Sequence, residues 1–140
     1  MIEPTKAVIH VVDDDEAIRD SLRWLLEASG YRVATYASAE DFLARYDPLR
    51  AGCLVLDIRM PGMSGLELQD ELERRGHTIP IIFVTGHGDV PMAVNALKKG
   101  ALDFIEKPFN DQVFLALIDK ALALDAQTRL SMQQLLLDVW

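Results

Sequence analysis

The chain has 140 residues, which is enough for one domain, and half of them are apolar, which is enough for a substantial core. Its formal charge of -8 disfavours direct binding to nucleic-acid phosphates, and its single cysteine, Cys53, excludes an internal disulfide or a multi-thiolate metal site. No apolar run approaches the roughly 20 residues of a membrane span, and Met1–Lys6 lacks the apolar core of a signal peptide, so we expect a soluble, cytoplasmic protein.

Strand-like and helix-like patterns alternate along the first third of the chain. Residues 7–12 predict a strand, and an amphipathic helix follows that ends near Gly30. Arg32–Tyr36 predicts a second strand, and Ser38 predicts the N-cap of a short helix that runs to about Tyr46. This order is typical of repeated β-α units.

The same alternation continues to the end of the chain. Strands are predicted over residues 53–56, 79–84 and 102–105, and helices over residues 66–75, 91–99 and from 110 onward. The last helix has an apolar stripe of Val113, Leu117, Ile118, Ala121 and Leu122. We therefore predict an α/β fold of the flavodoxin-like, CheY-like type: a doubly wound, five-stranded parallel sheet in the order 2-1-3-4-5, followed by a C-terminal helical extension.

Unusual polar residues follow four of the five predicted strands. Asp13 and Asp14 follow the first strand, Asp57 the third, Thr85 the fourth and Lys107 the fifth. Open α/β sheets bind ligands at the carboxyl ends of their strands, and the first and third strands are neighbours in this order. Three carboxylates in one crevice need a compensating cation, and oxygen ligands with open positions for water favour Mg²⁺ over a soft metal.

Each residue of this group also has a structural explanation, since acidic residues suit helix N-termini and lysines suit solvent. The joint pattern favours a site for phosphoryl transfer instead. Asp57 would attack phosphorus and form an aspartyl phosphate, while the metal, the Lys107 ammonium and the Thr85 hydroxyl would each stabilise one phosphoryl oxygen. The glycines nearby do not form a Walker A pattern, so nucleotide binding is not indicated.

Three segments carry a family resemblance: residues 11–16 (VVDDDE), 54–65 (LVLDIRMPGMSG) and 104–109 (FIEKPF). They resemble the receiver domain of two-component response regulators, and the resemblance covers about residues 6–124. Residues 85–94 (TGHGDVPMAV) further resemble the FixJ-like subgroup, whose members carry a LuxR-type helix-turn-helix output domain. We find no helix-turn-helix within these 140 residues.

The resemblance implies a role for each acidic residue of the site. Asp57 would be the phosphoacceptor and also a direct ligand of Mg²⁺, which Mn²⁺ could replace. Asp14 and the backbone carbonyl of Arg59 would be the other direct ligands. Asp13 would complete the acidic pocket, mainly through water.

The resemblance also implies contacts with the phosphoryl group and a switch. Thr85 and Lys107 would contact phosphoryl oxygens, and the Lys107–Pro108 bond would be cis. Phosphorylation would draw Thr85 toward the phosphoryl group and open space for Phe104 to turn inward. Many receivers have tyrosine where this chain has Phe104, so the switch here would depend on packing rather than on a hydroxyl.

A sensor histidine kinase is the implied phosphodonor. The resemblance implies a switching surface formed by the fourth helix, the fifth strand and the fifth helix. This surface would form a homodimer or contact the output domain. The protein would bind DNA only through that output domain. Such a protein catalyses only its own phosphorylation and dephosphorylation.

Two alternative functions remain. One is a haloacid-dehalogenase-type phosphatase, which would need a carboxylate where Arg59 stands. The other is a receiver-like interaction module that is never phosphorylated.

Residues 125–140 continue a helix-compatible pattern without glycine or proline. We place the receiver at residues 1–124 and interpret the remainder as a linker helix toward an output domain; the alternative is an amphipathic helix that pairs with a second copy. Trp24 lies off the apolar stripe of the first helix. We expect it to be half-buried against a neighbouring helix, and the alternative is an exposed position for kinase docking.

Overall fold

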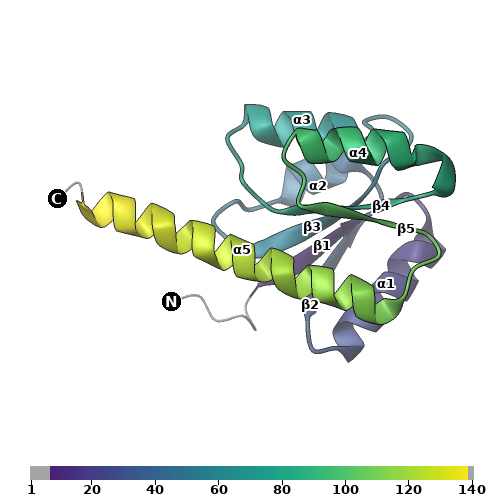
Figure 1. Cartoon of the computed structure of the whole chain (residues 1–140), viewed down its shortest axis with the longest axis horizontal. Helices are drawn as coiled ribbons and strands as arrows, with labels where there is room; N and C mark the ends of the chain where they lie inside the picture. Colours follow the sequence, from purple (N-terminus) through teal and green to yellow (C-terminus); the bar gives the residue numbers. More distant parts are fainter. Residues whose placement is uncertain (1–6, 139–140) are drawn as a thin grey trace.

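The computed structural model describes residues 7–138, which form a parallel sheet in the order β2-β1-β3-β4-β5 (Figure 1). The strands are β1 (Val8–Val12), β2 (Arg32–Tyr36), β3 (Gly52–Asp57), β4 (Ile81–Thr85) and β5 (Asp103–Glu106). The helices are α1 (Glu16–Ala28), α2 (Ala39–Arg45), α3 (Gly65–Arg74), α4 (Val90–Lys98) and α5 (Asp111–Asp138), with a single 3-10 turn over His87–Asp89. The predicted fold class and strand order are confirmed.

Helices cover both faces of the sheet because successive strand residues point to opposite sides (Figure 1). Val11 packs with Leu26 and Phe114 on the face covered by α1 and α5. Val12 packs with Phe42 on the face covered by α2, α3 and α4. The core is therefore two apolar layers separated by the sheet, and the polar strand ends lie beyond both.

Two side-chain predictions are wrong. Trp24 is 73% exposed rather than half-buried, because it lies about 200° around α1 from Leu22, which faces the sheet. Val113 is 54% exposed, and its neighbour Phe114 is fully buried instead. Asn110 caps α5 through the backbone N–H of Gln112, and this start places Phe114 on the stripe that faces the sheet.

The last helix, α5, continues without a break into the predicted extension as far as Asp138 and projects beyond the sheet (Figure 1). Asp125 is buried, and its Oδ2 accepts from the Gly52 N–H and from Arg129 Nε, both at 2.9 Å. The Arg129 guanidinium also donates to the carbonyls of Pro48, Leu49 and Arg50 at 3.2, 3.1 and 2.6 Å. We call these contacts of Asp125 and Arg129 the α5 clasp.

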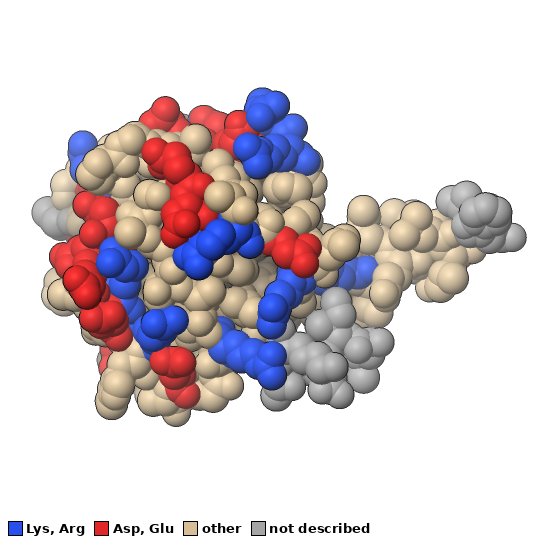
Figure 2. Space-filling model, turned by 180° about the vertical axis from the view of Figure 1, so that it is seen from behind, with Lys and Arg blue, Asp and Glu red and all other residues tan. Residues whose placement is uncertain are grey.

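Beyond the clasp, the extension exposes a series of large apolar side chains: Leu130, Met132, Leu135, Leu136 and Leu137. The boundary at residue 124 stays a prediction, and the two last residues of the predicted linker, Val139 and Trp140, lie outside the described residues. No helix within residues 7–138 is long and apolar enough to cross a membrane. On the side opposite to that of Figure 1, Lys and Arg side chains lie between groups of Asp and Glu, some of them near the base of the projecting helix (Figure 2).

Candidate functional site

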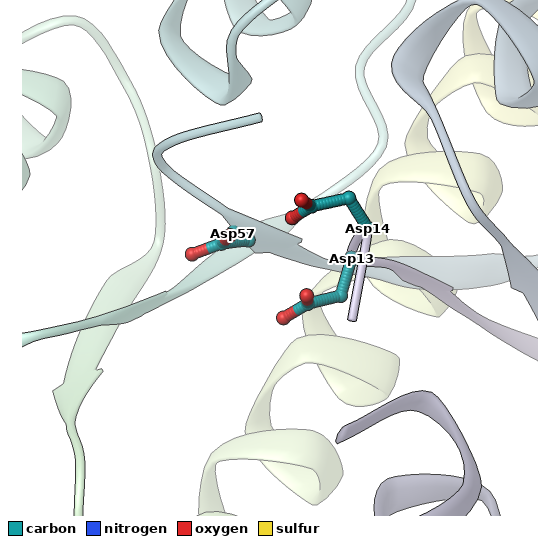
Figure 3. A group of neighbouring side chains, drawn as sticks. All are labelled: Asp13, Asp14 and Asp57. Atoms are coloured by element: carbon teal, nitrogen blue, oxygen red, sulfur yellow. The ribbon is translucent and has the colours of Figure 1, made fainter. Parts of the chain in front are cut away.

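Three carboxylates meet where two neighbouring strands end. The register of β1 and β3 pairs Val12 with Leu56, so Asp13, Asp14 and Asp57 emerge at the same edge of the sheet. One carboxylate oxygen from each of the three lies within 4.8 Å of the others. Figure 3 shows Asp13 and Asp14 extending from the end of β1 toward the end of β3, where Asp57 lies. The predicted acidic crevice is present.

Asp13 is the most deeply buried of the three acids, at 3% exposure. Its Oδ1 accepts from the backbone N–H of Asp15 at 2.9 Å, and its carbonyl oxygen accepts from the Arg19 guanidinium at 2.7 Å. Asp15 in turn caps the N-terminus of α1 by accepting from Ala17. Burial is the main cause that raises the pKa of Asp13. The start of α1 therefore holds this carboxylate in the crevice, where solvent stabilises it poorly.

The carboxyl group of Asp57 has a pKa raised to about 6. Burial is the largest cause, and the charges of Asp13 and Asp14 add to it, whereas Lys107 and the backbone N–H of Ile58 oppose it. The positive charge of Lys107 therefore does not fully compensate the ionised form of this carboxyl group. The set of hard oxygen donors, all within reach of one centre, fits a divalent cation such as Mg²⁺.

A close backbone contact holds the loop that follows Asp57. The N–H of Gly65 donates to the carbonyl of Ile58 at 2.9 Å, and a Cβ at Gly65 would lie 2.1 Å from the carbonyl oxygen of Asp57. Directly before it, Ser64 and Glu67 form a reciprocal capping box that starts α3. Only glycine fits at position 65, and the loop therefore stays close to the end of β3.

Lys107 and Thr85 come from the ends of the two remaining strands. The backbone N–H of Lys107 donates to the Thr85 carbonyl at 2.9 Å, and the Lys107 ammonium lies 3.9 Å from Asp13 Oδ2. The Lys107–Pro108 bond is cis, as predicted. Thr85 is fully buried, and its hydroxyl donates to the carbonyl of Gly86 at 3.1 Å. The ammonium thus faces the acidic crevice, whereas the hydroxyl is engaged within its own turn.

Phe104 and Thr85 are close on one face of the sheet. The register of β4 and β5 pairs Phe83 with Phe104 and Thr85 with Glu106, so Thr85 and Phe104 are diagonal neighbours on the side covered by α4. Phe104 is half-buried against the apolar layer on that side. A movement of one of these two side chains would change the space available to the other.

The side chain of Arg59 makes a contact that the sequence did not predict. Its Nε lies 2.7 Å from Asp89 Oδ1, and its terminal nitrogen lies 3.6 Å from the sulfur of Met92. The side chain therefore joins the loop after Asp57 to the 3-10 turn and α4. The sequence carries no signal for this pair, since Arg59 and Asp89 are 30 residues apart and belong to different loops.

Comparisons with known proteins agree with this architecture. The family model of the response regulator receiver domain matches residues 9–119. The transcriptional regulatory protein FixJ of Azorhizobium caulinodans is 51% identical over 124 residues, which cover 89% of this chain and 59% of that protein.

Two solved structures are similar over most of the chain. The response regulator StyR matches with a TM-score of 0.88 and 47% identity, over 92% of this chain and 65% of StyR. The crystal structure of FixJ-N matches with a TM-score of 0.78 and 51% identity, over 82% of this chain and 92% of that one. The chain spans a little over half the length of the curated relatives it matches.

Proposed function

Because this chain belongs to the response regulator receiver domain family, and because its curated relatives include FixJ proteins, we propose that it is a phosphorylated signalling switch. Asp57 accepts a phosphoryl group from a phosphohistidine of a sensor histidine kinase. The observation that carries this proposal is the cluster of Asp13, Asp14 and Asp57 within 4.8 Å, with the Lys107 ammonium beside it.

The transfer is a nucleophilic displacement at phosphorus. A carboxylate oxygen of Asp57 forms the new P–O bond as the P–N bond to the imidazole breaks, and the imidazole nitrogen recovers its electron pair and takes a proton from solvent. The Lys107 ammonium attracts one phosphoryl oxygen and the Thr85 hydroxyl, once turned from Gly86, donates to another. The product is an aspartyl phosphate.

Four residues around the crevice would hold Mg²⁺ or Mn²⁺: Asp14, Asp57 and the Arg59 carbonyl directly, and Asp13 through water. When bound, the cation neutralises negative charge on the transferring phosphoryl group. Burial and the neighbouring acids raise the pKa of Asp57, and a bound cation would favour its ionised form. This supports the assignment. The Asp15 and Arg19 contacts that orient Asp13 hold its side chain ready for that role.

Phosphorylation changes the surface formed by α4, β5 and α5. Thr85 moves toward the phosphoryl group, and Phe104 turns into the space on the same side of the sheet. A tenfold change in population needs about 1.4 kcal/mol of differential stabilisation. The altered surface then forms a homodimer or contacts a LuxR-type output domain, which alone would bind DNA.

Residues 1–124 form the receiver in this proposal, and residues 125–140 form a linker helix toward the output domain. The receiver is not a classical enzyme, and the reactions it promotes are its own phosphorylation and dephosphorylation. We place it in the cytoplasm, where a kinase's phosphohistidine is accessible. A phosphatase of the haloacid-dehalogenase type would want a second carboxylate two residues after Asp57, where Arg59 stands.

Intact mass spectrometry with acetyl phosphate tests the proposal. With Mg²⁺, the protein should gain one phosphoryl group in a hydroxylamine-labile form, and Asp57→Asn should gain none. Asp20→Asn, a carboxyl removed from the exposed side of α1, is the matched control and should react like the wild type. An adduct that persists in Asp57→Asn, or that forms equally in EDTA, would contradict the assignment. Steady release of phosphate from simple monoesters would favour the phosphatase instead.

A further inference from the structure

A second polar cavity lies against β1 and β2, and none of the three acids of the crevice lines it. It has a volume of about 300 Å³, at the lower end of the range for small-ligand sites. Its polar lining comes from β1, β2, the last residue of α2 and the segment that follows α2: His10, Arg32, Tyr36, Arg45, Asp47 and Arg50. None of these residues takes part in the chemistry proposed for Asp57.

The cavity is basic although the protein is acidic overall. Three arginines and one aspartate line it, in a chain whose formal charge is -8. Arg45 lies 4.4 Å over the ring of Tyr36 and is already paired with Asp41 at 2.9 Å. Arg32 and Arg50 are exposed and form no ion pair with any residue in the described part of the chain. Two guanidinium groups are therefore available to an anion.

The wall of the cavity contains a buried polar group that lacks a partner. His10 is 5% exposed and its Nδ1 lies 2.9 Å from the Tyr36 hydroxyl, whereas its Nε2 has no hydrogen-bond partner among residues 7–138. Burial, aided by the charge of Arg50, lowers the pKa of His10 to about 4, so the ring is neutral at pH 7. If the Tyr36 hydroxyl donates to Nδ1, the ring proton lies on Nε2 and needs an acceptor.

We propose that this cavity binds a small phosphate-bearing anion. Arg32 and Arg50 provide the positive charge, and guanidinium groups match phosphate oxygens with paired hydrogen bonds. A phosphate oxygen, directly or through a bound water, supplies the acceptor that His10 Nε2 lacks. The Arg45 guanidinium, stacked on the ring of Tyr36, forms a further wall of the cavity. The proposal is independent of the chemistry at Asp57.

Binding of inorganic pyrophosphate, followed by NMR on the whole chain in EDTA, tests the proposal. Without a divalent cation, the acidic crevice repels the probe. We expect saturable chemical-shift changes at the His10 ring and at the backbone amides of residues 32–34, Asp47, Leu49 and Arg50. The double variant Arg32→Gln/Arg50→Gln should weaken binding at least tenfold and, because both side chains are exposed, should keep the wild-type melting temperature.

Arg23→Gln/Arg74→Gln is the matched control, since it removes the same charge from exposed positions on α1 and α3 and should bind like the wild type. Equal weakening by the two double variants would overturn the proposal, because it would show attraction to general charge only. Shifts that do not saturate, or that centre elsewhere, would also overturn it. Citrate that binds as tightly as pyrophosphate would refute the assignment to phosphate.

Discussion

Replacing Asp57 by Asn should stabilise the metal-free protein at neutral pH. The pKa of Asp57 is raised from 3.8 to about 6 in the folded state, so the folded protein binds this proton more tightly than the unfolded chain does. As the pH rises from about 4 through 6, the folded state must ionise a carboxyl that burial and two neighbouring acids disfavour, and stability falls. Above about pH 6 the penalty is fully present. Asparagine has a similar shape and no charge to ionise, so it removes the penalty.

The size of the effect follows from the pKa. A rise from 3.8 to about 6 corresponds to about 3 kcal/mol before solvent screening, at 1.36 kcal/mol per pKa unit. The carboxyl group is only partly buried, so screening reduces this to about 1 kcal/mol. For a chain of this size that gain raises the melting temperature by roughly 3–6 °C.

Thermal unfolding in EDTA, followed by circular dichroism between about pH 4.5 and 8, provides the assay. The difference between Asp57→Asn and the wild type should be largest above pH 6 and shrink as the pH falls toward 4. Asp20→Asn, on the exposed side of α1, should show no such difference. Added Mg²⁺ should stabilise the wild type more than Asp57→Asn. A variant that is no more stable than the wild type at about pH 7.5 would refute the claim that burial and the neighbouring acids penalise the ionised form of Asp57.

Three further substitutions test packing and contacts. Gly65→Ala should lower the free energy of unfolding by about 2–3 kcal/mol, because its Cβ would lie 2.1 Å from the Asp57 carbonyl oxygen; an unchanged urea midpoint would contradict this. Arg129→Ala should lower the free energy of unfolding by about 2–3 kcal/mol, because it leaves the buried Asp125 carboxylate with the Gly52 N–H alone. Urea unfolding measures this loss, and the control Arg23→Ala should change stability by less than about 0.5 kcal/mol. Trp24→Gln should also stay within about 0.5 kcal/mol, since the side chain is 73% exposed, and a loss above 1 kcal/mol would show that the indole packs against the fold.

Features that depend on neighbouring residues in the chain were predictable from the sequence. The apolar runs predicted all five strands, and Ser38 caps α2 by accepting from the Asp41 N–H, as its position suggested. The polar residues at strand ends predicted the crevice, because parallel strands place their carboxyl ends at one edge of a sheet. The start of β4 shifted to Ile81, since Pro80 before it has no N–H to donate.

Features that depend on contacts between distant residues were not predictable. The position of Trp24 depends on whether another element covers that side of α1, and none does among the described residues. The pair of Arg59 with Asp89, and the contacts of Arg129 with the carbonyls of residues 48–50, join loops whose relative position follows only from the assembled fold. Arg59, Asp89 and Arg129 are charged residues whose spacing in the sequence is typical of ordinary surface positions.

The α5 clasp fixes the helix at Arg129, so a rotation of the helix about this point would displace its free end. From Arg129 to Asp138 the helix rises about 14 Å beyond its last hydrogen bond to the loop before β3, at 1.5 Å per residue. If the helix axis tilted by about 10° about Arg129, the end at Asp138 would move by about 2 Å, more than the length of a covalent bond. The loss or gain of one hydrogen bond to the carbonyls of residues 48–50 would therefore be amplified along the helix axis into a displacement of its tip.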